Sequence, residues 1–158
     1  MQANWAMSYS SLHELKHASA LDLAVQGTFT KIVRTQGQFA PSNGQDALLS
    51  TDFSFAVSKV LLDSHHAPGN APANFTVHQS GGWLGGTLHQ VCDDPLFQAG
   101  EEAVLFLHEF QPGQYYVMGG PSGRFEVRGG LVQPVNDEGV KLPANLTTAR
   151  FYALFQNT

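Results

Sequence analysis

Near the start of the chain, the apolar positions follow the period of a helix. Leu12 and Leu15 lie three residues apart, as residues on one face of a short helix do. Ser11 precedes them, and Glu14 follows Ser11 by three residues, which is the capping-box pattern of a helix N-terminus. The pattern therefore predicts a short helix that begins after Ser11 and ends near Ser19.

From Leu23 onward, apolar residues alternate with polar ones, which is the period of a half-buried strand. Segments rich in β-branched and aromatic residues recur between turns that contain glycine and proline. Gly27 interrupts the first segment and predicts a bend or a bulge. At the end of the chain the apolar residues return to helical spacing, which predicts a helix over 143–155. Strands are expected at 23–34, 52–62, 74–79, 87–92, 103–110, 115–118, 124–127 and 131–135.

Several short strands joined by glycine-rich turns indicate a sandwich or a small barrel. A helix followed by long strands favours the barrel over an immunoglobulin-like sandwich. We therefore expect a mainly β chain: a small closed or partly open barrel, like that of the oligonucleotide/oligosaccharide-binding (OB) fold, with an N-terminal and a C-terminal helix. The 158 residues suit a single domain over 1–158 that buries its own core.

The charge content narrows the possible partners and the compartment. Charged residues make up 13% of the chain, against about 25% in an average soluble domain. The net charge is −5 and the basic residues are scattered singly, so nucleic acid is not an expected partner. No apolar run is long enough to span a membrane. Low charge suits an exported protein, and the first eleven residues lack a signal-peptide pattern, so we expect a mature extracellular or periplasmic form.

Cys92 is the single cysteine, which excludes an intramolecular disulfide and any multi-cysteine metal or redox site. It ends an apolar predicted strand, so we expect a buried thiol that reacts slowly. Asp93 and Asp94 precede Pro95 and are interpreted as the end of that strand rather than as an acid–base pair. The GxSxG element of α/β-hydrolases is absent, and no cofactor is expected.

Three elements follow one another in the second half of the chain. The first is Gly-Gly-x-x-Gly-Gly over 81–86. The second is Pro95-x-Phe97-x-x-Gly100-Glu101, and the third is Tyr115-x-Val117-x-Gly119-x-x-x-Gly123-x-Phe125. Together with the first helix and strand, they resemble a group of exported bacterial proteins over about residues 11–125.

Domains of that group look like the barrels of tissue inhibitors of metalloproteinases and of netrin modules. This resemblance implies a fold and not a function. The inhibitors chelate the zinc of a protease with an N-terminal cysteine. Here the chain begins Met1-Gln2-Ala3 and its cysteine is Cys92, which argues against that mechanism.

Most residues of these elements are interpreted as structural. The glycines over 81–86 predict a tight turn or a bulge, because the element lacks the lysine and the serine or threonine of a phosphate-binding loop. The later glycines are expected where strands reverse and a positive φ is needed. The glutamate is expected to accept backbone N–H bonds, and the phenylalanine to point inward. These residues are Gly81, Gly82, Gly85, Gly86, Gly100, Glu101, Gly119, Gly123 and Phe125.

Trp83, His78 and His89 are the candidate binding residues. An indole serves equally as a core residue or as an exposed contact. His78 and His89 belong to successive predicted strands and would bind a metal together if they met across the turn. No metal-ligand spacing such as HExxH is present, so we interpret the histidines as surface or hydrogen-bonded residues. No catalytic or metal-ligating residue is assigned.

The sequence favours a non-catalytic, exported binding or interaction module for a protein or a cell-envelope partner. Two alternatives stay open. The first is a metal-binding protein or an enzyme that uses the histidines. The second is a subunit of an extracellular assembly, because low charge and apolar strands favour self-association.

Overall fold

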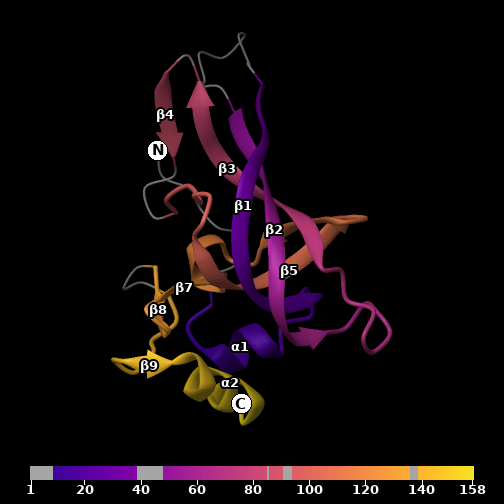
Figure 1. The fold of residues 1–158 in the computed structure, drawn as a ribbon, viewed down its shortest axis with the longest axis vertical. Coiled ribbons are helices and arrows are strands. Elements are labelled where there is room, and N and C mark those ends of the chain that lie inside the picture. Colours follow the sequence, from indigo (N-terminus) through magenta and orange to yellow (C-terminus); the bar gives the residue numbers. More distant parts are fainter. Residues whose placement is uncertain (1–8, 39–47, 85, 91–93, 136–138) are drawn as a thin grey trace.

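The fold is that of a computed structural model, which describes residues 9–38, 48–84, 86–90, 94–135 and 139–158. Its elements are α1 (Leu12–Lys16), β1 (Leu23–Gln38), β2 (Leu48–Asp63), β3 (Asn74–Leu84), β4 (Thr87–Gln90), β5 (Glu102–Gln111), β6 (Gln114–Val117), the 3-10 helix η1 (Gly120–Gly123), β7 (Arg124–Arg128), β8 (Leu131–Pro134), β9 (Leu146–Thr147) and α2 (Thr148–Gln156). Figure 1 shows β1, β2 and β3 running side by side along the long axis, with both helices at one end.

Five of these strands form a closed barrel. Neighbouring strands pair in the order β1, β2, β3, β6 and β5, and β5 pairs back with β1. The β3–β6 pair is parallel, and the other four pairs around the barrel are antiparallel. β7, β8 and β9 extend the sheet from β5, while β4 pairs with β3. The prediction of a mainly β barrel with a short helix near each terminus is confirmed.

Strand β5 separates two hydrophobic cores. Ala103, Leu105 and Leu107 belong to the core inside the barrel, together with aromatic residues of β1, β2 and β3. Val104 and Phe106 belong to a second core, which α1 and α2 cover. Because both faces of β5 are covered, its residues are apolar at consecutive positions instead of alternating.

The two helices are capped and joined to each other. The Ser11 hydroxyl accepts a hydrogen bond from the Glu14 N–H at 3.1 Å, as the capping pattern predicts. The Glu14 carboxylate accepts from the Ser10 N–H at 3.0 Å. α1 ends at Lys16, earlier than predicted, and the Lys16 ammonium donates to the Phe155 carbonyl at the end of α2 at 2.7 Å. A cation at a helix C-terminus is favourable, so this contact stabilises α2 and ties it to α1.

The second helix begins later than the sequence predicts. Leu146 and Thr147 first pair with β8 as the short strand β9, and α2 starts at Thr148. The Thr147 hydroxyl then caps the helix by accepting from the Arg150 N–H at 3.3 Å. Apolar spacing alone does not distinguish the capping strand from the helix that it precedes.

Gly27 lies at the predicted irregularity of the first strand. The pairing of β1 with β2 shifts register between Gln26 and Gly27, so the predicted bulge is confirmed. A Cβ atom on Gly27 would lie 2.1 Å from the carbonyl oxygen of Ala56. The strand therefore needs a residue without a side chain at this position.

The predicted turn over residues 81–86 is wrong for residues 81–84. β3 continues through Gly81 and Gly82 to Leu84. A Cβ atom on Gly82 would lie 2.7 Å from side-chain atoms of both Thr35 and Thr51, so glycine lets these side chains pack onto the strand. The Thr51 hydroxyl also donates to the Gly81 carbonyl at 2.8 Å.

Candidate functional site

Trp83 lies near the end of β3 with its side chain in solvent. The residue is 56% exposed, and its cross-strand partner on β4, Leu88, is 40% exposed. Ile32 of β1 is 52% exposed and lines the same groove of about 500 Å³, whose described lining residues carry no charge. We refer to Trp83, Leu88, Ile32 and this groove as the Trp83 surface. Of the two interpretations of Trp83, the structure places it at the surface and not in a core.

His78 and His89 are not opposite each other in the β3–β4 hairpin. The register pairs His89 with Gly82, four positions beyond His78. Four strand residues span about 13 Å. The backbone therefore does not bring the two candidate histidines together across the turn.

Part of the predicted site lies outside the residues that the structure describes. These are Gly85, Cys92, Asp93 and the side chain of His89. The burial and slow reaction of the Cys92 thiol therefore stay predictions. Gly86, which precedes β4, has a φ of +80° and open space around its α-carbon, as a turn glycine does.

His78 is held by a buried carboxylate. Its Nδ1 lies 2.7 Å from Oδ1 of Asp52, whose Oδ2 accepts from Arg34 Nε at 2.8 Å. Arg34, Asp52 and His78 are direct cross-strand partners on β1, β2 and β3. Burial raises the pKa of the Asp52 carboxyl, but the hydrogen bonds from Arg34 and His78 lower it more, so it lies below its usual range. The carboxylate stays ionised and fixes the imidazole.

A second carboxylate holds two further histidines near the other end of the barrel. Oδ2 of Asp22 lies 2.9 Å from His108 Nδ1, and Oδ1 of Asp22 lies 3.1 Å from His65 Nε2. Nδ1 of His65 faces Glu109 Oε1 at 3.1 Å. Burial raises the pKa of Glu109, but hydrogen bonds from the Gly113 N–H and from neighbouring side chains bring it below its usual range. His65 is therefore hydrogen-bonded to a carboxylate, while Nδ1 of His108 is hydrogen-bonded to the Ala20 carbonyl and lies at ion-pair distance from Asp22.

Glu101 and Asp94 belong to a buried ion-pair network around Arg124. The Arg124 side chain is 2% exposed. Its Nη1 donates to Asp94 Oδ1 at 2.7 Å and its Nη2 to Glu101 Oε1 at 3.3 Å, while its guanidinium lies 4.2 Å from the centre of the Phe97 ring. Oε2 of Glu101 also accepts from the Gln98 N–H at 3.2 Å. Asp94 therefore does more than end a strand: it neutralises a buried cation.

The remaining glycines of the three elements differ in why they are needed. Gly100 and Gly119 have φ angles of +89° and +63°, which glycine adopts without steric cost. Gly123 has no positive φ; a Cβ atom there would lie 2.2 Å from the carbonyl oxygen of Met118. For Gly123 the expectation of a positive φ is therefore wrong, and close approach of the backbone is the reason.

Phe125 belongs to the second core. It is 1% exposed, and its ring centre lies 5.9 Å from that of Phe106 and 5.5 Å from that of Phe151 in α2. It therefore points into the layer between the barrel and α2.

The sequence does not single out Asp22, Asp52 or Arg124. In the structure, the two aspartates hold histidines, and the arginine holds Asp94 and Glu101. Each looks like an ordinary polar position, and each acquires its role through a distant segment: Asp52 lies 26 residues from His78, and Arg124 lies 30 residues from Asp94. The signal that finds Asp52 is strand register, because it is the direct cross-strand neighbour of His78.

The described histidines and carboxylates form no group of three or more that is arranged to hold a metal ion. Within the same residues, neither helix is long and apolar enough to cross a bilayer. No protein-family model matches this chain, and no curated protein or solved structure shows a significant similarity to it.

Proposed function

We propose that this chain is a non-catalytic binding module, exported from a bacterial cell, that engages a protein or another cell-envelope partner through the Trp83 surface. The observation that carries the proposal is the exposure of Trp83 on a paired strand, beside an uncharged groove. Clustered exposed apolar residues mark interaction sites on soluble domains. Tryptophan is the residue type most enriched among those that dominate binding energy.

The proposed fold type is the OB barrel. The strand order β1-β2-β3-β6-β5-β1 with a parallel β3–β6 closure supports it, with β4 as an additional hairpin strand. OB barrels bind ligands through a face of their second and third strands and through loops, and Trp83 projects from the third strand. The low charge content supports export.

Co-sedimentation with bacterial cell-envelope fragments tests the proposal, with the membranes and the peptidoglycan assayed separately. Trp83→Ala is expected to lower the bound fraction about tenfold or more, the effect of losing a dominant contact. Leu154→Ala is the matched control, because Leu154 is an exposed apolar residue, 39% exposed, on α2. It is expected to bind like the unchanged protein.

Equal binding by the unchanged protein and by Trp83→Ala contradicts the proposal, and so does the absence of binding by either. Light scattering on the same purified proteins tests the alternative that the chain is a subunit of an extracellular assembly. A dimer that Trp83→Ala converts to a monomer would show that a second copy of the chain covers this surface.

A further inference from the structure

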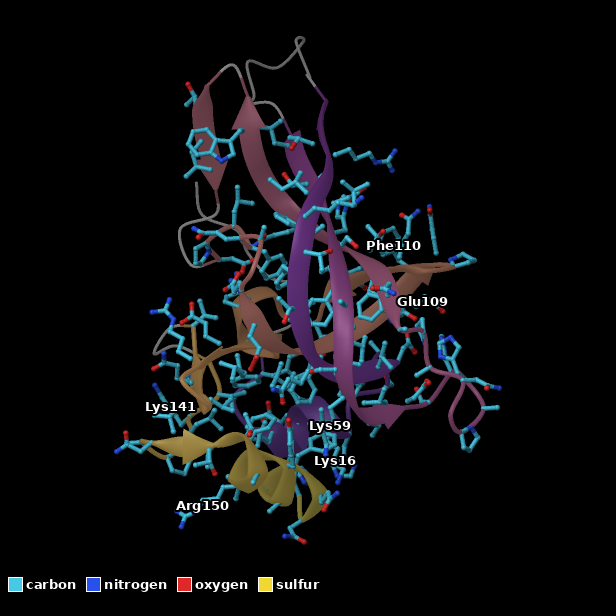
Figure 2. The ribbon with its side chains drawn as sticks, viewed as in Figure 1. Lys16, Lys59, Glu109, Phe110, Lys141 and Arg150 are labelled. Carbon is cyan, nitrogen blue, oxygen red and sulfur yellow. The ribbon has the colours of Figure 1, made fainter. Side chains whose placement is uncertain are left out.

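A second group of exposed rings lies on the outer face of the barrel. His78 of β3 is the cross-strand partner of Tyr116 of β6, and Tyr116 is the partner of His108 of β5. Phe110 follows on β5. We refer to these four residues as the aromatic row. Tyr116 is 42% exposed and Phe110 is 38% exposed. Figure 2 shows Phe110 at the far end of β5, away from the end where Lys16 and Arg150 lie.

The rings of the row lie against one another, and we refer to the surface that they form as the seat. The planes of Phe110 and Tyr116 differ by 29° and their centres lie 5.8 Å apart. The His78 ring is inclined by 67° to Phe110 at 5.8 Å, and the His108 ring by 55° to Tyr116 at 5.1 Å. Two nearly parallel rings therefore lie between two steeply inclined imidazoles.

In both imidazoles, Nδ1 lies within hydrogen-bond distance of an oxygen atom of the protein. Nδ1 of His78 lies 2.7 Å from a carboxylate oxygen of Asp52. Nδ1 of His108 lies 2.9 Å from Asp22 Oδ2 and 2.8 Å from the carbonyl oxygen of Ala20. The Ala20 carbonyl and the ionised carboxylate of Asp52 only accept, so Nδ1 carries the proton in each ring. Nε2 is then a hydrogen-bond acceptor in the neutral imidazole, and it is the nitrogen left for a ligand.

A cavity of about 400 Å³ adjoins one end of the row. It lies where β3 and β6 separate after their short paired segment. Tyr116 and His78 line it together with Ser80 and Met118. This volume falls within the range of small-molecule sites, which combine apolar walls with a few placed polar groups.

We propose that the aromatic row binds a pyranose ring of a neutral oligosaccharide, and that the adjoining cavity receives the next sugar unit. A pyranose has an apolar C–H face that packs on aromatic rings, and a rim of hydroxyl groups that donate to acceptors. In the seat, the rings of Phe110 and Tyr116 would pack on the C–H face. The two Nε2 atoms would accept hydrogen bonds from the hydroxyl groups.

Other ligand classes fit this seat less well. An anion would meet the nitrogen lone pairs of the two imidazoles, and the carboxylate of Asp22 lies behind that of His108, which is electrostatically unfavourable. A purely apolar group would cover both nitrogens without replacing their hydrogen bonds to water. The site goes beyond the proposed function, and none of the exposed residues Trp83, Leu88 and Ile32 lines this cavity.

The test is an NMR titration of the full chain with maltotetraose, cellotetraose, mannotetraose and chitotetraose, each measured separately. At least one is expected to bind saturably with a Kd of about 1 mM or tighter, and to shift signals of Tyr116 and the two histidines. Tyr116→Leu, which keeps an apolar side chain but removes the ring, is expected to weaken that binding about tenfold. His108→Gln is expected to weaken it severalfold.

Leu154→Ala, at an exposed apolar residue of α2, is the matched control and is expected to bind the sugar like the unchanged protein. Absence of saturable binding by all four sugars overturns the proposal, and so does unchanged affinity in Tyr116→Leu. Loss of sugar binding in Trp83→Ala with retention in Tyr116→Leu would also overturn it, by moving the sugar to the Trp83 surface. Retained sugar binding in a Trp83→Ala protein that no longer binds envelope fragments separates the two sites.

Discussion

Among the described residues, the sheet is covered by helices at one end of the molecule and by no helix at the other. Beneath α1 and α2, Val104 and Phe106 of β5 are fully buried. On the long strands, Ile32 is 52% exposed and Trp83 is 56% exposed. Figure 1 shows that β1 and β3 extend away from the helices toward the opposite end of the molecule.

The difference between these regions lies in what covers them and not in how apolar they are. An apolar residue on the outside of a sheet is buried only if another element packs on it. The helices near the two termini cover the face around β5 and β7, and no described helix packs on the Trp83 surface. Residues of the covered region are therefore expected to govern stability, and those of the bare region to govern binding.

Phe125→Ala should give the largest loss of stability, because it truncates a ring in the covered core. Deleting a buried phenylalanine side chain costs about 3–5 kcal/mol of unfolding free energy. Chemical denaturation followed by circular dichroism measures this loss. A loss below about 1 kcal/mol would mean that the layer under α2 is loosely packed, and the comparison between the two regions would fail.

Glu101→Gln should cost less, about 1–3 kcal/mol, because it weakens a hydrogen bond with the buried Arg124 and leaves the packing in place. Glu126→Gln is the matched control, since Glu126 pairs with the largely exposed Arg128 at 3.4 Å. We expect little change in the control. Thermal stability that is unchanged in Glu101→Gln, together with a lost binding activity, would make Glu101 a functional residue.

Asp52 should make stability depend on pH. Its folded pKa lies below the unfolded value because Arg34 and His78 donate to it, so its contribution is present above the unfolded pKa of about 3.9 and is lost as the pH falls through the folded pKa. Asp52→Asn is expected to lower stability at pH 7 by about 1 kcal/mol and to flatten the acid limb of the stability profile. Denaturation curves from pH 2 to pH 7 check both, and parallel curves for the two proteins would contradict the assignment.

Trp83→Ala should have the smallest effect on stability, within about 0.5 kcal/mol, because the side chain is mostly in solvent. The same denaturation measurement applies. A cost of 2 kcal/mol or more, at about the scale of a buried side chain, would show that the indole is a structural residue and would remove the basis of the proposed binding surface.

The sequence predicts those features that depend on neighbours along the chain. The serine cap of α1 and the bulge at Gly27 follow from local rules and are confirmed. The turn expected at Gly82 is wrong because the position is governed by the side chains of Thr35 and Thr51, which come from other strands. Local composition does not contain that information.

The candidate site shows the same limit. The sequence identifies Trp83 and His78 as candidates but leaves the exposure of Trp83 open, because an amphipathic ring suits either environment. The aromatic row cannot be predicted from the sequence, because Tyr116 becomes the neighbour of His78 only through the parallel pairing of β3 with β6. Parallel pairs join segments that are distant in sequence, so no turn signal announces them.

The closure of the barrel also has a consequence for the order of folding. β1 and β2 follow one another in sequence, so we expect their long hairpin to form before the barrel closes. The other edge of β1 pairs with β5. Val25 therefore pairs with Leu105 only after this much later strand is present. During synthesis, one edge of β1 therefore has no hydrogen-bonding partner, and the phenylalanines of the hairpin are exposed, until β5 has left the ribosome. We expect this interval to be the period in which the chain is most prone to aggregate.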